Sequence, residues 1–392
     1  MINLIIVPFH DYKKWNEEGF RTRDAHLCEH FAKQKEIGRI LVVNRPTSLA
    51  EMFIKRKSWK SKGEKLEYSH KNTQLSKMQD KTWCLDIFVP DFIKVFYQRK
   101  TWWFTSFNYE KVSRAINEAC SYLDIEDSIL LLQNPMAIGV VNGVKKKKVV
   151  FDAIDNWLYH PQMNNKKLIE ENYNFVDKNA DLIMTVSKAL LDVFPTNKNK
   201  HWIPNGVDIE YFKAAKKTER DDTITIGYVG KIQDRVDFDL VEECLIRYPT
   251  ANFVFLGPVY SQKQRVKELK KRYRNINFKG DIHYTKLPEE MHGFDIAIIP
   301  HKVDEFTNSM NPLKLYEYLA AGKMVVTTEV AGIESISEYV HCAKDKDSFI
   351  DEIEKVLKEI NIVTPEDIVN SVPSECIWNN RLRTILDLFD KL

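Results

Sequence analysis

Lys314 and Glu317 lie three residues apart in the second half of the chain, a spacing that places two side chains on one face of a helix. Such a helix would have Asn311 as its N-cap, Pro312 in its first position and Gly322 just past its end. Its first turn would offer N–H groups and the positive end of the helix dipole to a diphosphate. Glu317, one turn further in, could accept hydrogen bonds from two ribose hydroxyls. Taken alone, such a Lys–Glu pair is more often a surface ion pair, so the surrounding sequence has to decide.

The first half of the chain offers further candidates at the expected ends of strands. Asp152 and Asp155 follow an apolar run and could contact ligand hydroxyls or act as a general base. His10 and His160 are further candidates, although a lone Asp or His at a strand end is more often structural or merely exposed. Gly19 occupies the first loop after the first apolar run, where a glycine could let the backbone approach a phosphate. An ordinary turn glycine is the equally good alternative.

The sequence gives little support for a metal site. Asp237-Phe238-Asp239 has the Asp-x-Asp form of some metal sites, but it stands at an expected helix start, where acidic residues are favoured anyway. No group of His and Cys residues has zinc-site spacing. We therefore expect neither a metal ion nor another cofactor. The cysteines are widely scattered, which is typical of free, mostly buried thiols in a reducing compartment: Cys28, Cys84, Cys120, Cys244, Cys342 and Cys376.

These candidates need elements that bring them to one edge of a sheet. Short apolar runs alternate with longer amphipathic stretches, the pattern of parallel strands covered by helices on both faces. The alternation is interrupted at about residues 47–108 and begins again after residue 205. We therefore predict an α/β protein of two Rossmann-like domains, residues 1–205 with an insertion at about 47–108, and residues 206–375. An amphipathic segment, residues 376–392, ends the chain.

The predicted elements can be given by residue number. In the first half we expect one helix at 24–35 and strands at 4–7, 40–43, 129–132, 149–151 and 182–186; within the interruption only 83–89 resembles a buried strand. In the second half we expect strands at 223–229, 252–256, 276–279, 296–299 and 324–327, and helices at 238–247, 262–272, 312–321 and 347–360.

Length and charge restrict the class of protein. A chain of 392 residues is long enough for two domains, or at most three. A net charge of only +2 speaks against a dedicated nucleic-acid-binding protein. The apolar N-terminal run lacks the basic start and cleavage site of a signal peptide, and no apolar run is long enough to span a membrane. We therefore expect a cytoplasmic protein that does not bind nucleic acid.

Two basic stretches within the interruption contain tryptophan. Residues 55–65 carry six basic residues and one Glu around Trp59, and residues 99–104 contain Trp102 and Trp103. Basic residues interleaved with Trp suit an anionic membrane surface. A solvated loop with the aromatic rings packed beneath it is the alternative, and the sequence leaves both open.

Several motifs occur in the order found in GT-B glycosyltransferases, family 4 (group 1) in particular. Residues 311–326, Asn-Pro-Leu-Lys-Leu-Tyr-Glu-Tyr-Leu-Ala-Ala-Gly-Lys-Met-Val-Val, resemble the donor-binding stretch of that family. Residues 201–212 are similar to the family's interdomain segment, and residues 226–235 to the opening strand and loop of its second domain. Further matches lie at residues 181–190 and 253–258. The resemblance runs from about residue 149 to the C-terminus and, more loosely, over residues 1–46.

Within the family, the chain looks closest to the teichuronic-acid and capsular-polysaccharide glycosyltransferases. Two features carry this, residues 150–157, Val-Phe-Asp-Ala-Ile-Asp-Asn-Trp, and the Asp-Arg-Val-Asp run at 234–237. The resemblance implies that the two domains face a cleft and that residues 376–392 form a terminal helix that packs on the first domain.

The resemblance also implies roles for single residues. Lys231 and Arg235 match paired basic residues of the family that bind the diphosphate and stabilise charge on the leaving nucleotide. Without the resemblance, Lys231 and Arg235 would as readily be exposed loop charges. Glu317 matches the second Glu of a Glu-x7-Glu motif, but the first position is Ser309, which leaves the usual sugar contact open. The implied donor-binding residues are Gly19, Gly230, Lys231, Arg235, Gly257, Asn311, Pro312, Leu313, Lys314 and Glu317; the catalytic candidates are Lys231, Arg235 and Asp155, and the acceptor-binding candidates are Asp152, Asp155 and His160.

The implied activity is transfer of a sugar from a nucleotide-diphosphate sugar to a glycan or lipid-linked envelope polysaccharide, with retention and without a metal. The partners would be the donor, the acceptor and an anionic membrane at the inner face of the plasma membrane. Two alternatives stay open. A nucleotide-sugar 2-epimerase has the same architecture but needs no acceptor surface, and a degenerate transferase could act as an assembly partner, at which Ser309 hints.

Overall fold

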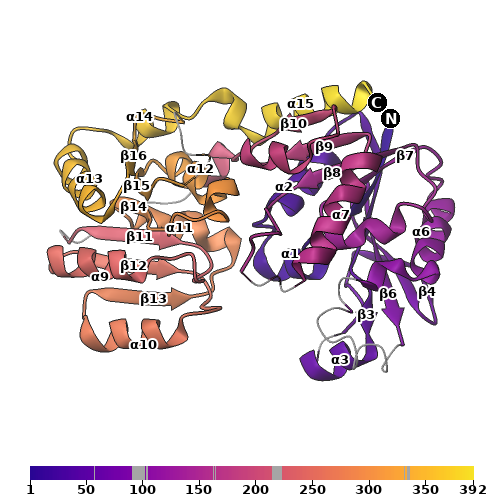
Figure 1. The fold of residues 1–392 in the computed structure, drawn as a ribbon, viewed down its shortest axis with the longest axis horizontal. Helices are drawn as coiled ribbons and strands as arrows, with labels where there is room; N and C mark the ends of the chain where they lie inside the picture. The colour runs from indigo at the N-terminus through magenta and orange to yellow at the C-terminus, as the bar shows by residue number, and fades with distance from the viewer. Residues whose placement is uncertain are drawn as a thin grey trace. The chain divides into compact units, whose positions relative to one another are not determined.

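The computed structural model describes residues 1–56, 58–90, 102, 105–161, 163, 165–213, 223–330, 332 and 336–392. The chain divides into two compact units, each with its own sheet (Figure 1). Unit 1 comprises Met1–Ile203 together with Thr384–Leu392, and unit 2 comprises Pro204–Arg383. The division falls within the last helix, α15 (Trp378–Asp390).

The sheet of unit 1 has the strand order β10-β9-β8-β7-β1-β2-β6-β5-β4, and β3 pairs with β6 in addition. The path from β10 to β6 is parallel, whereas β6, β5 and β4 pair in antiparallel fashion. The strands are β1 (Ile2–Val7), β2 (Ile37–Val43), β3 (Thr47–Ser48), β4 (Lys65–His70), β5 (Thr73–Gln79), β6 (Thr82–Val89), β7 (Ser128–Leu132), β8 (Lys148–Ala153), β9 (Leu182–Thr185) and β10 (Lys200–Trp202).

The predicted interruption is therefore partly a continuation of the sheet. The sequence predicted β6 but missed β4 and β5, which extend the parallel sheet with two antiparallel strands at this edge. The physical reason is that β4 has no buried position, so its residues carry no hydrophobic alternation to reveal it.

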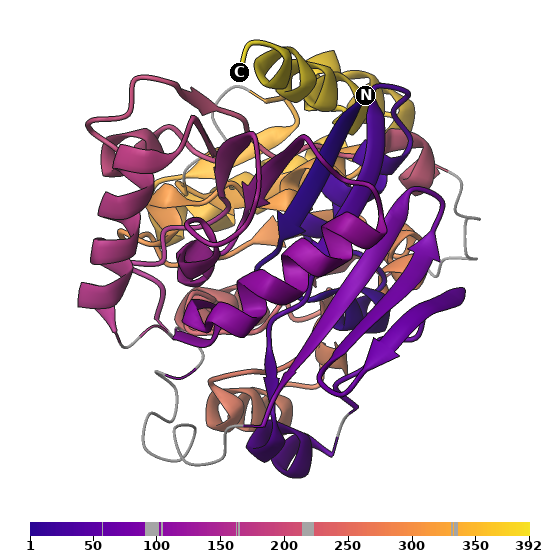
Figure 2. The same cartoon turned by 90° about the vertical axis from the view of Figure 1, so that its right-hand side faces the viewer.

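Helices cover both faces of the unit 1 sheet. One apolar cluster joins alternate residues of β1, β2 and β7 to α6, α7 and η2, while α2 packs against β2 on the other face (Figures 1 and 2). On that second face the rings of Phe31 and Phe389 stack at 5.8 Å. The helices of this unit are α1 (Tyr12–Glu18), α2 (Arg23–Ala32), α3 (Leu49–Lys55), η1 (Ser106–Asn108), α6 (Glu110–Tyr122), η2 (Pro135–Val140), α7 (Lys166–Asn179) and η3 (Ala189–Val193).

The sheet of unit 2 is entirely parallel, in the order β13-β12-β11-β14-β15-β16. Five of these strands lie where the sequence predicts them; β16, only one residue of which is buried, was not predicted. The strands are β11 (Thr225–Val229), β12 (Asn252–Leu256), β13 (Ile276–Gly280), β14 (Ile296–Ile299), β15 (Met324–Thr328) and β16 (Val340–Ala343).

The helices of unit 2 pack their apolar faces onto this sheet in one hydrophobic cluster. They are α8 (Ile209–Lys213), α9 (Phe238–Arg247), α10 (Lys263–Arg272), η4 (Tyr284–Lys286), α11 (Leu287–His292), η5 (Thr307–Ser309), α12 (Leu313–Ala320), α13 (Lys346–Glu359), α14 (Pro365–Asn370) and η6 (Ser374–Cys376). The chain crosses from β14 to β15 through α12, so α12 begins at the carboxyl edge of the sheet, where ligands bind in open α/β sheets.

Two expectations about the whole chain can be compared with the structure. All six cysteines are free, and five of them are buried, with Cys342 exposed. In the part of the chain that the structure describes, none of the helices has both the length and the apolar character needed to cross a bilayer.

Candidate functional site

Two glycine turns shape the carboxyl edge of the unit 2 sheet. Gly230 follows β11 with φ +140° and Gly257 follows β12 with φ +144°, conformations that L side chains rarely adopt. A Cβ on Gly257 would lie 2.1 Å from the carbonyl oxygen of Gly230, so the two turns pack backbone against backbone. A Cβ on Gly230 would lie 2.5 Å from Nζ of Lys314. The two glycines therefore let the strand ends close tightly over α12.

The Lys314 side chain is buried beneath the Gly230 turn. Its Nζ donates to the hydroxyl of Tyr228 at 2.9 Å, lies 3.5 Å from Nε2 of His301 and stands 4.1 Å from the centre of the Tyr228 ring. The Tyr228 hydroxyl lies 3.2 Å from the same His301 nitrogen. The structure therefore excludes a surface ion pair, the alternative for Lys314 and Glu317 taken alone, because both side chains are buried.

Arg235 is the second basic group at this edge. Its Nη1 contacts the sulfur of Met310 at 3.9 Å, while its Nε is buried without a hydrogen-bond partner among the described residues. Lys231, the third, is half-buried with its Nζ 5.7 Å from the centre of the Tyr260 ring. No carboxylate in the described ranges forms an ion pair with Arg235 or Lys314. The edge thus has an excess of positive charge.

The electrostatics reflect this excess. Burial, together with the charge of Arg235, holds the pKa of Lys314 well below its usual value of 10.5, although Glu317 acts in the opposite direction. Burial and the charges of Lys314 and Arg235 hold the pKa of His301 well below 6.5. Burial raises the pKa of Tyr228, against the influence of Arg235. An anion bound here would raise the pKa of both Lys314 and His301 and so favour their charged forms.

Glu317 lies one turn inside α12 and is buried, with 5% of its surface exposed. One of its carboxylate oxygens accepts a hydrogen bond of 2.9 Å from the hydroxyl of Tyr284, at the start of η4. Burial, and then the charge of Glu317, raise the pKa of Tyr284 well above its usual value. The ring of Tyr284 stacks on that of Tyr211 at 5.3 Å. Glu317 therefore stands beside a pair of stacked aromatic rings.

The start of α12 differs from the prediction. The N-cap is Pro312 rather than Asn311, and the helix runs from Leu313. Asn311 instead bonds to the segment that opens unit 2: its Oδ1 accepts from the backbone N–H of Asn205 at 2.8 Å, and Asn205 donates to its carbonyl at 2.6 Å. The N-cap prediction was wrong because the Asn311 amide has competing partners, which hold Asn205 against the helix start.

Ser309 and Asp237 both have local structural bonds. The hydroxyl of Ser309 donates to the carbonyl of Phe306 at 2.8 Å and is buried. Asp237 is the N-cap of α9, and its carboxylate accepts from the N–H groups of Asp239 and Leu240. The acidic run at the start of α9 thus has the capping role that the sequence suggested.

In unit 1, the Asp152 carboxylate is buried in an ion pair. It is fully buried in β8, forms a two-pronged ion pair with Arg23 at 2.9–3.1 Å, and accepts from Gln133 at 3.0 Å. The buried side chain thus has a structural role, in which Asp152 ties β8 to the start of α2. Sequence reasoning could not detect this, because Arg23 lies 129 residues away.

The other unit 1 candidates gather at the carboxyl ends of β1 and β8. Asp155 follows β8, and its carbonyl accepts from the Tyr173 hydroxyl at 3.1 Å. The ring of His160 lies 5.1 Å from that of Trp157, which stacks on Phe9 at 4.0 Å. The edge is thus lined by aromatic rings next to a carboxylate residue and an imidazole.

His10, at the end of β1, bonds to α2. Its backbone N–H donates to the Asp24 carboxylate at 2.9 Å. Burial alone would raise the pKa of Asp24, but hydrogen bonds and charge from His10, with the Thr22 hydroxyl, lower it to about 2. Gly19 does not directly follow β1, because helix α1, which the sequence did not predict, comes between them. Gly19 ends α1 with φ +81°, and its backbone N–H donates to the Trp15 carbonyl. Its position fits the helix-ending role of a glycine.

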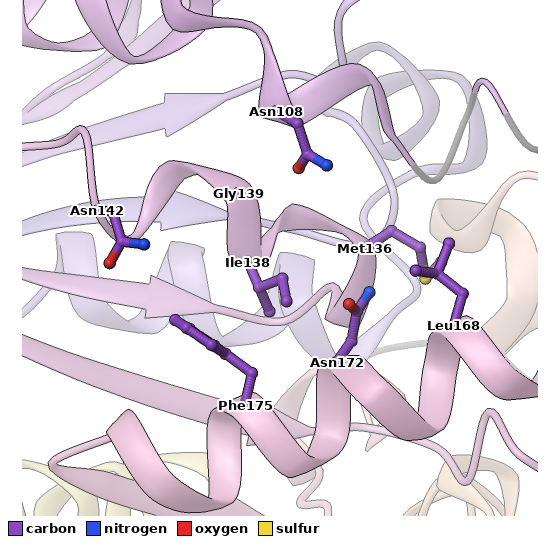
Figure 3. A pocket seen from close by; sticks show the side chains of 8 residues that line it. All are labelled: Asn108, Met136, Ile138, Gly139, Asn142, Leu168, Asn172 and Phe175. Atoms are coloured by element: carbon purple, nitrogen blue, oxygen red, sulfur yellow. The ribbon is translucent and has the colours of Figure 1, made fainter.

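A groove of about 250 Å³ runs between η2 and α7 (Figure 3). Asn172 anchors its floor by donating to the Pro135 carbonyl at 2.9 Å. The groove combines amide groups with apolar side chains and contains none of the predicted acceptor residues. Its lining residues are Asn108, Met136, Ile138, Gly139, Asn142, Leu168, Asn172 and Phe175.

Sequence reasoning missed three residues of the unit 2 edge. His301 directly follows the predicted strand at 296–299 and its Pro300, so its position at a strand end was a usable signal. Tyr228 lies inside a predicted strand, where an aromatic residue is ordinary core material. Tyr284 gave no signal, because only the fold brings it to Glu317.

Known proteins are similar to this chain in two respects, the sequence of unit 2 and the fold of the whole chain. Residues 223–359 match the family described as Glycosyl transferases group 1. TuaH of Bacillus subtilis (strain 168), a protein assigned as a teichuronic acid biosynthesis glycosyltransferase, is 28% identical over 262 residues, which cover 61% of this chain and 66% of that protein. The chain thus spans just under two thirds of that relative.

Two solved structures are similar over the whole chain. Sucrose-phosphate synthase from Thermosynechococcus elongatus has a TM-score of 0.71 at 12% identity and covers 100% of this chain and 99% of its own. Anabaena Alr3699/HepE in complex with UDP-glucose has a TM-score of 0.65 at 11% identity, covering 100% of both chains. The chain therefore has the two-domain α/β fold of the GT-B glycosyltransferases, and residues 223–359 of its second unit are similar to the group 1 family.

Proposed function

We propose that the protein is a glycosyltransferase that moves a sugar from a nucleoside-diphosphate sugar to a glycan or lipid-linked acceptor of the cell envelope. The observation that carries the donor half is the uncompensated positive charge at the carboxyl edge of the unit 2 sheet. There the buried Nε of Arg235 has no hydrogen-bond partner among the described residues. Charge-assisted bonds to a diphosphate would satisfy it, and the dipole of α12 would add to the attraction.

The same groups would act on the reaction itself. When the bond between the anomeric carbon and the diphosphate breaks, negative charge collects on the leaving phosphate oxygen. Lys231 and Arg235 are proposed to stabilise that charge, which is the role that a metal ion fills in other transferases. Gly230 and Gly257 would let the backbone approach the phosphates, and Glu317 would accept hydrogen bonds from the ribose. The proposed reaction proceeds with retention and without a metal.

The proposed acceptor side uses the carboxyl edge of unit 1. Asp155 and His160 are the proposed acceptor contacts, since Asp152 is fully buried in its ion pair with Arg23, and Asp155 is the one proposed as a base. Two comparisons support the substrate classes: TuaH is assigned to teichuronic acid biosynthesis, and the Anabaena structure is described as a complex with UDP-glucose. We propose that the acceptor is presented at the inner face of the plasma membrane.

The first test is binding of UDP, GDP, dTDP and CDP, measured by calorimetry and thermal shift with EDTA present. We expect one nucleoside diphosphate to raise the melting temperature by mass action. Arg235→Ala should weaken its binding about tenfold or more, because a hydrogen bond to a charged group contributes about 1.5–3 kcal/mol. The matched control is Arg247→Ala, whose guanidinium is mostly exposed on α9 and pairs only loosely, at 3.8 Å, with Glu354.

The outcomes separate the three functions. Binding that Arg235→Ala weakens about tenfold or more and Arg247→Ala leaves intact supports the donor site. Absence of binding by all four nucleotides would favour an assembly partner. An epimerase would convert the bound nucleotide-sugar to its epimer without any acceptor, which NMR of the sugar ring would show. A transferase would instead release the nucleoside diphosphate, and only when an acceptor is added would it do so rapidly.

A further inference from the structure

The end of α3 exposes two large apolar side chains next to each other. Phe53 is 73% exposed and Ile54 is 81% exposed, although residues of these types are usually buried. The helix ends directly after them, at Arg56, whose φ is +50°. The chain therefore turns back at this point and leaves both side chains in solvent.

Basic residues follow this apolar pair. Arg56, Lys60 and Lys62 are all exposed, while Lys57 lies outside the described residues. Trp59 is half-buried, with its ring 5.7 Å from that of Phe88 and the Lys60 Nζ 5.1 Å above it. We name Phe53, Ile54, Arg56, Lys60 and Lys62 the α3 tip.

The described Trp residues of this region are packed against the fold and are not the exposed apolar groups. Trp59 packs against Phe88, and Trp102 is buried, with its indole N–H donating to the Tyr109 hydroxyl at 3.3 Å. Trp103 lies outside the described residues. Both described rings are thus packed against the fold, as in the alternative that the sequence left open, and the apolar side chains in solvent are Phe53 and Ile54.

The place of the tip in unit 1 is set by the sheet. β3 pairs in parallel with the last residues of β6, Thr47 with Phe88 and Ser48 with Val89. α3 follows β3 at once, so the tip extends beyond the carboxyl ends of the unit 1 strands, as Figures 1 and 2 show. Asp155 and His160 follow a strand of the same sheet at that same edge.

We propose that the α3 tip docks onto an anionic lipid membrane, with Phe53 and Ile54 entering the boundary between headgroups and acyl chains and the basic residues contacting lipid phosphates. This deepens the proposed function, on which it rests for its purpose, by naming the surface through which unit 1 reaches a lipid-linked acceptor. Apolar side chains surrounded by Lys and Arg are the combination that holds proteins at such a surface.

Size and charge favour a membrane over a protein partner. A stable protein interface buries about 800 Å² on each side around a desolvated core, and two side chains at a helix end are too few to supply one. A bilayer surrounds whatever enters it, so two side chains are enough to add to the electrostatic attraction. The exposed charged residues that the structure describes between 56 and 62 are all positive, and the next exposed acid along the chain is Glu64.

The test is sedimentation of the whole chain with two kinds of vesicle. One contains phosphatidylcholine alone, and the other contains phosphatidylcholine with about 30% phosphatidylglycerol, which is on the order of natural anionic content. We expect binding to the anionic vesicles only, and less of it at high salt. Phe53→Ala with Ile54→Ala should lower the partition coefficient about tenfold or more, since each large side chain contributes about that factor when it leaves water. Arg56→Glu with Lys60→Glu should lower it similarly.

Matched controls separate the tip from general effects. Ile246→Ala with Ile362→Ala removes apolar side chains that are 63% and 78% exposed elsewhere, and Lys270→Glu with Lys271→Glu changes charge on α10. Both control variants should bind vesicles like the wild type. Equal binding by tip and control variants, or equal binding to both kinds of vesicle, would overturn the proposal. The nucleotide melting shift is measured on the same variants: its absence from the wild type contradicts the proposed function, whereas vesicle binding judges the tip.

Discussion

At the residue scale, the notable feature is a cluster of basic groups without a matching carboxylate. Lys314, His301 and Tyr228 contact one another, and Arg235 lies close enough to influence all three. Glu317 is the nearby acid, and it bonds to Tyr284. Burial and the charge of Arg235 lower the pKa of Lys314 and of His301 when no anion is present. The free site is therefore prepared to gain protons together with a ligand.

We expect nucleoside diphosphate binding to strengthen as the pH falls from about 8 to 6. The pKa of His301 lies well below 6.5 in the free protein, so the ring is neutral; a nearby diphosphate raises that pKa, and binding then takes up a proton. For one group the affinity gain is at most about tenfold per pH unit. Calorimetry in buffers of different ionisation enthalpy measures the uptake directly.

A comparison of variants isolates the His301 contribution. The ligand's own protonation affects all proteins equally, so only the difference in slope between wild type and His301→Gln counts. His341→Gln is the control, because His341 pairs with Glu352 on β16 and α13. If wild type and His301→Gln have the same slope, the uptake belongs to another group. The effect of pH on folding stability is a separate matter. Because the pKa of His301 is lower in the folded protein than 6.5, its contribution to stability is present above pH 6.5 and is lost as the pH falls through the folded value.

The sequence predicted the residues of the donor edge better than their contacts. Lys231, Arg235, Lys314 and Glu317 all belong to unit 2, on the loop after β11 and on α12. The burial of Lys314 was not predictable, because it depends on the close approach of the Gly230 turn to α12. Asp152 shows the same limit in unit 1, since its partner Arg23 is remote in sequence.

At the element scale, the turns after the strands of unit 2 differ in how much space they have. Gly257 and Gly280 both have positive φ, but a Cβ on Gly257 would meet the Gly230 backbone, whereas a Cβ on Gly280 would meet nothing within 4 Å. The two positions therefore separate backbone strain from steric collision.

We expect Gly257→Ala to lower the free energy of unfolding by about 3 kcal/mol or more, because strain of about 1–3 kcal/mol adds to a collision that only backbone movement can relieve. Gly280→Ala should cost about 1 kcal/mol, the strain alone. Urea unfolding followed by circular dichroism measures both. Equal losses for the two variants would mean that the β11 and β12 turns are not packed as described.

The elements that the sequence predicted are those with a strong hydrophobic period. β12, β14 and α9 have the predicted ends, and most other strands differ by one to three residues. Two of the strands that it missed have few buried residues: β4 has none, and β16 has one. Their pairing comes from neighbouring strands rather than from their own composition, so a single sequence does not reveal it.

At the scale of the whole molecule, every implied donor-binding residue except Gly19 lies in unit 2. A ligand that binds only the folded state stabilises the part of the chain that must unfold to release it. The stabilisation is about 2.7 kcal/mol when the ligand concentration is one hundred times the dissociation constant. With a saturating nucleoside diphosphate, we expect amide exchange in the core strands β11, β12 and β14 to slow about 100-fold. Exchange in β1, β2 and β7 should change little.

Hydrogen-exchange mass spectrometry distinguishes the two units directly. Slowing confined to unit 2 means that each unit unfolds as its own cooperative body. Equal slowing in both would show that the chain unfolds as one. Arg235→Ala serves as the control, since binding weakened about tenfold or more should cut the slowing in β11, β12 and β14 to about 10-fold or less at the same nucleotide concentration.

The cysteines give the protein a practical chemical property. Burial raises the pKa of the thiols of Cys28, Cys84, Cys120, Cys244 and Cys376, those of Cys120 and Cys244 to about 12, so these sulfurs react slowly with electrophiles. Cys342 alone is exposed, on β16 of unit 2. A maleimide fluorophore should therefore attach at one position of the unmodified chain, which supplies a reporter on the donor unit without removal of any native thiol.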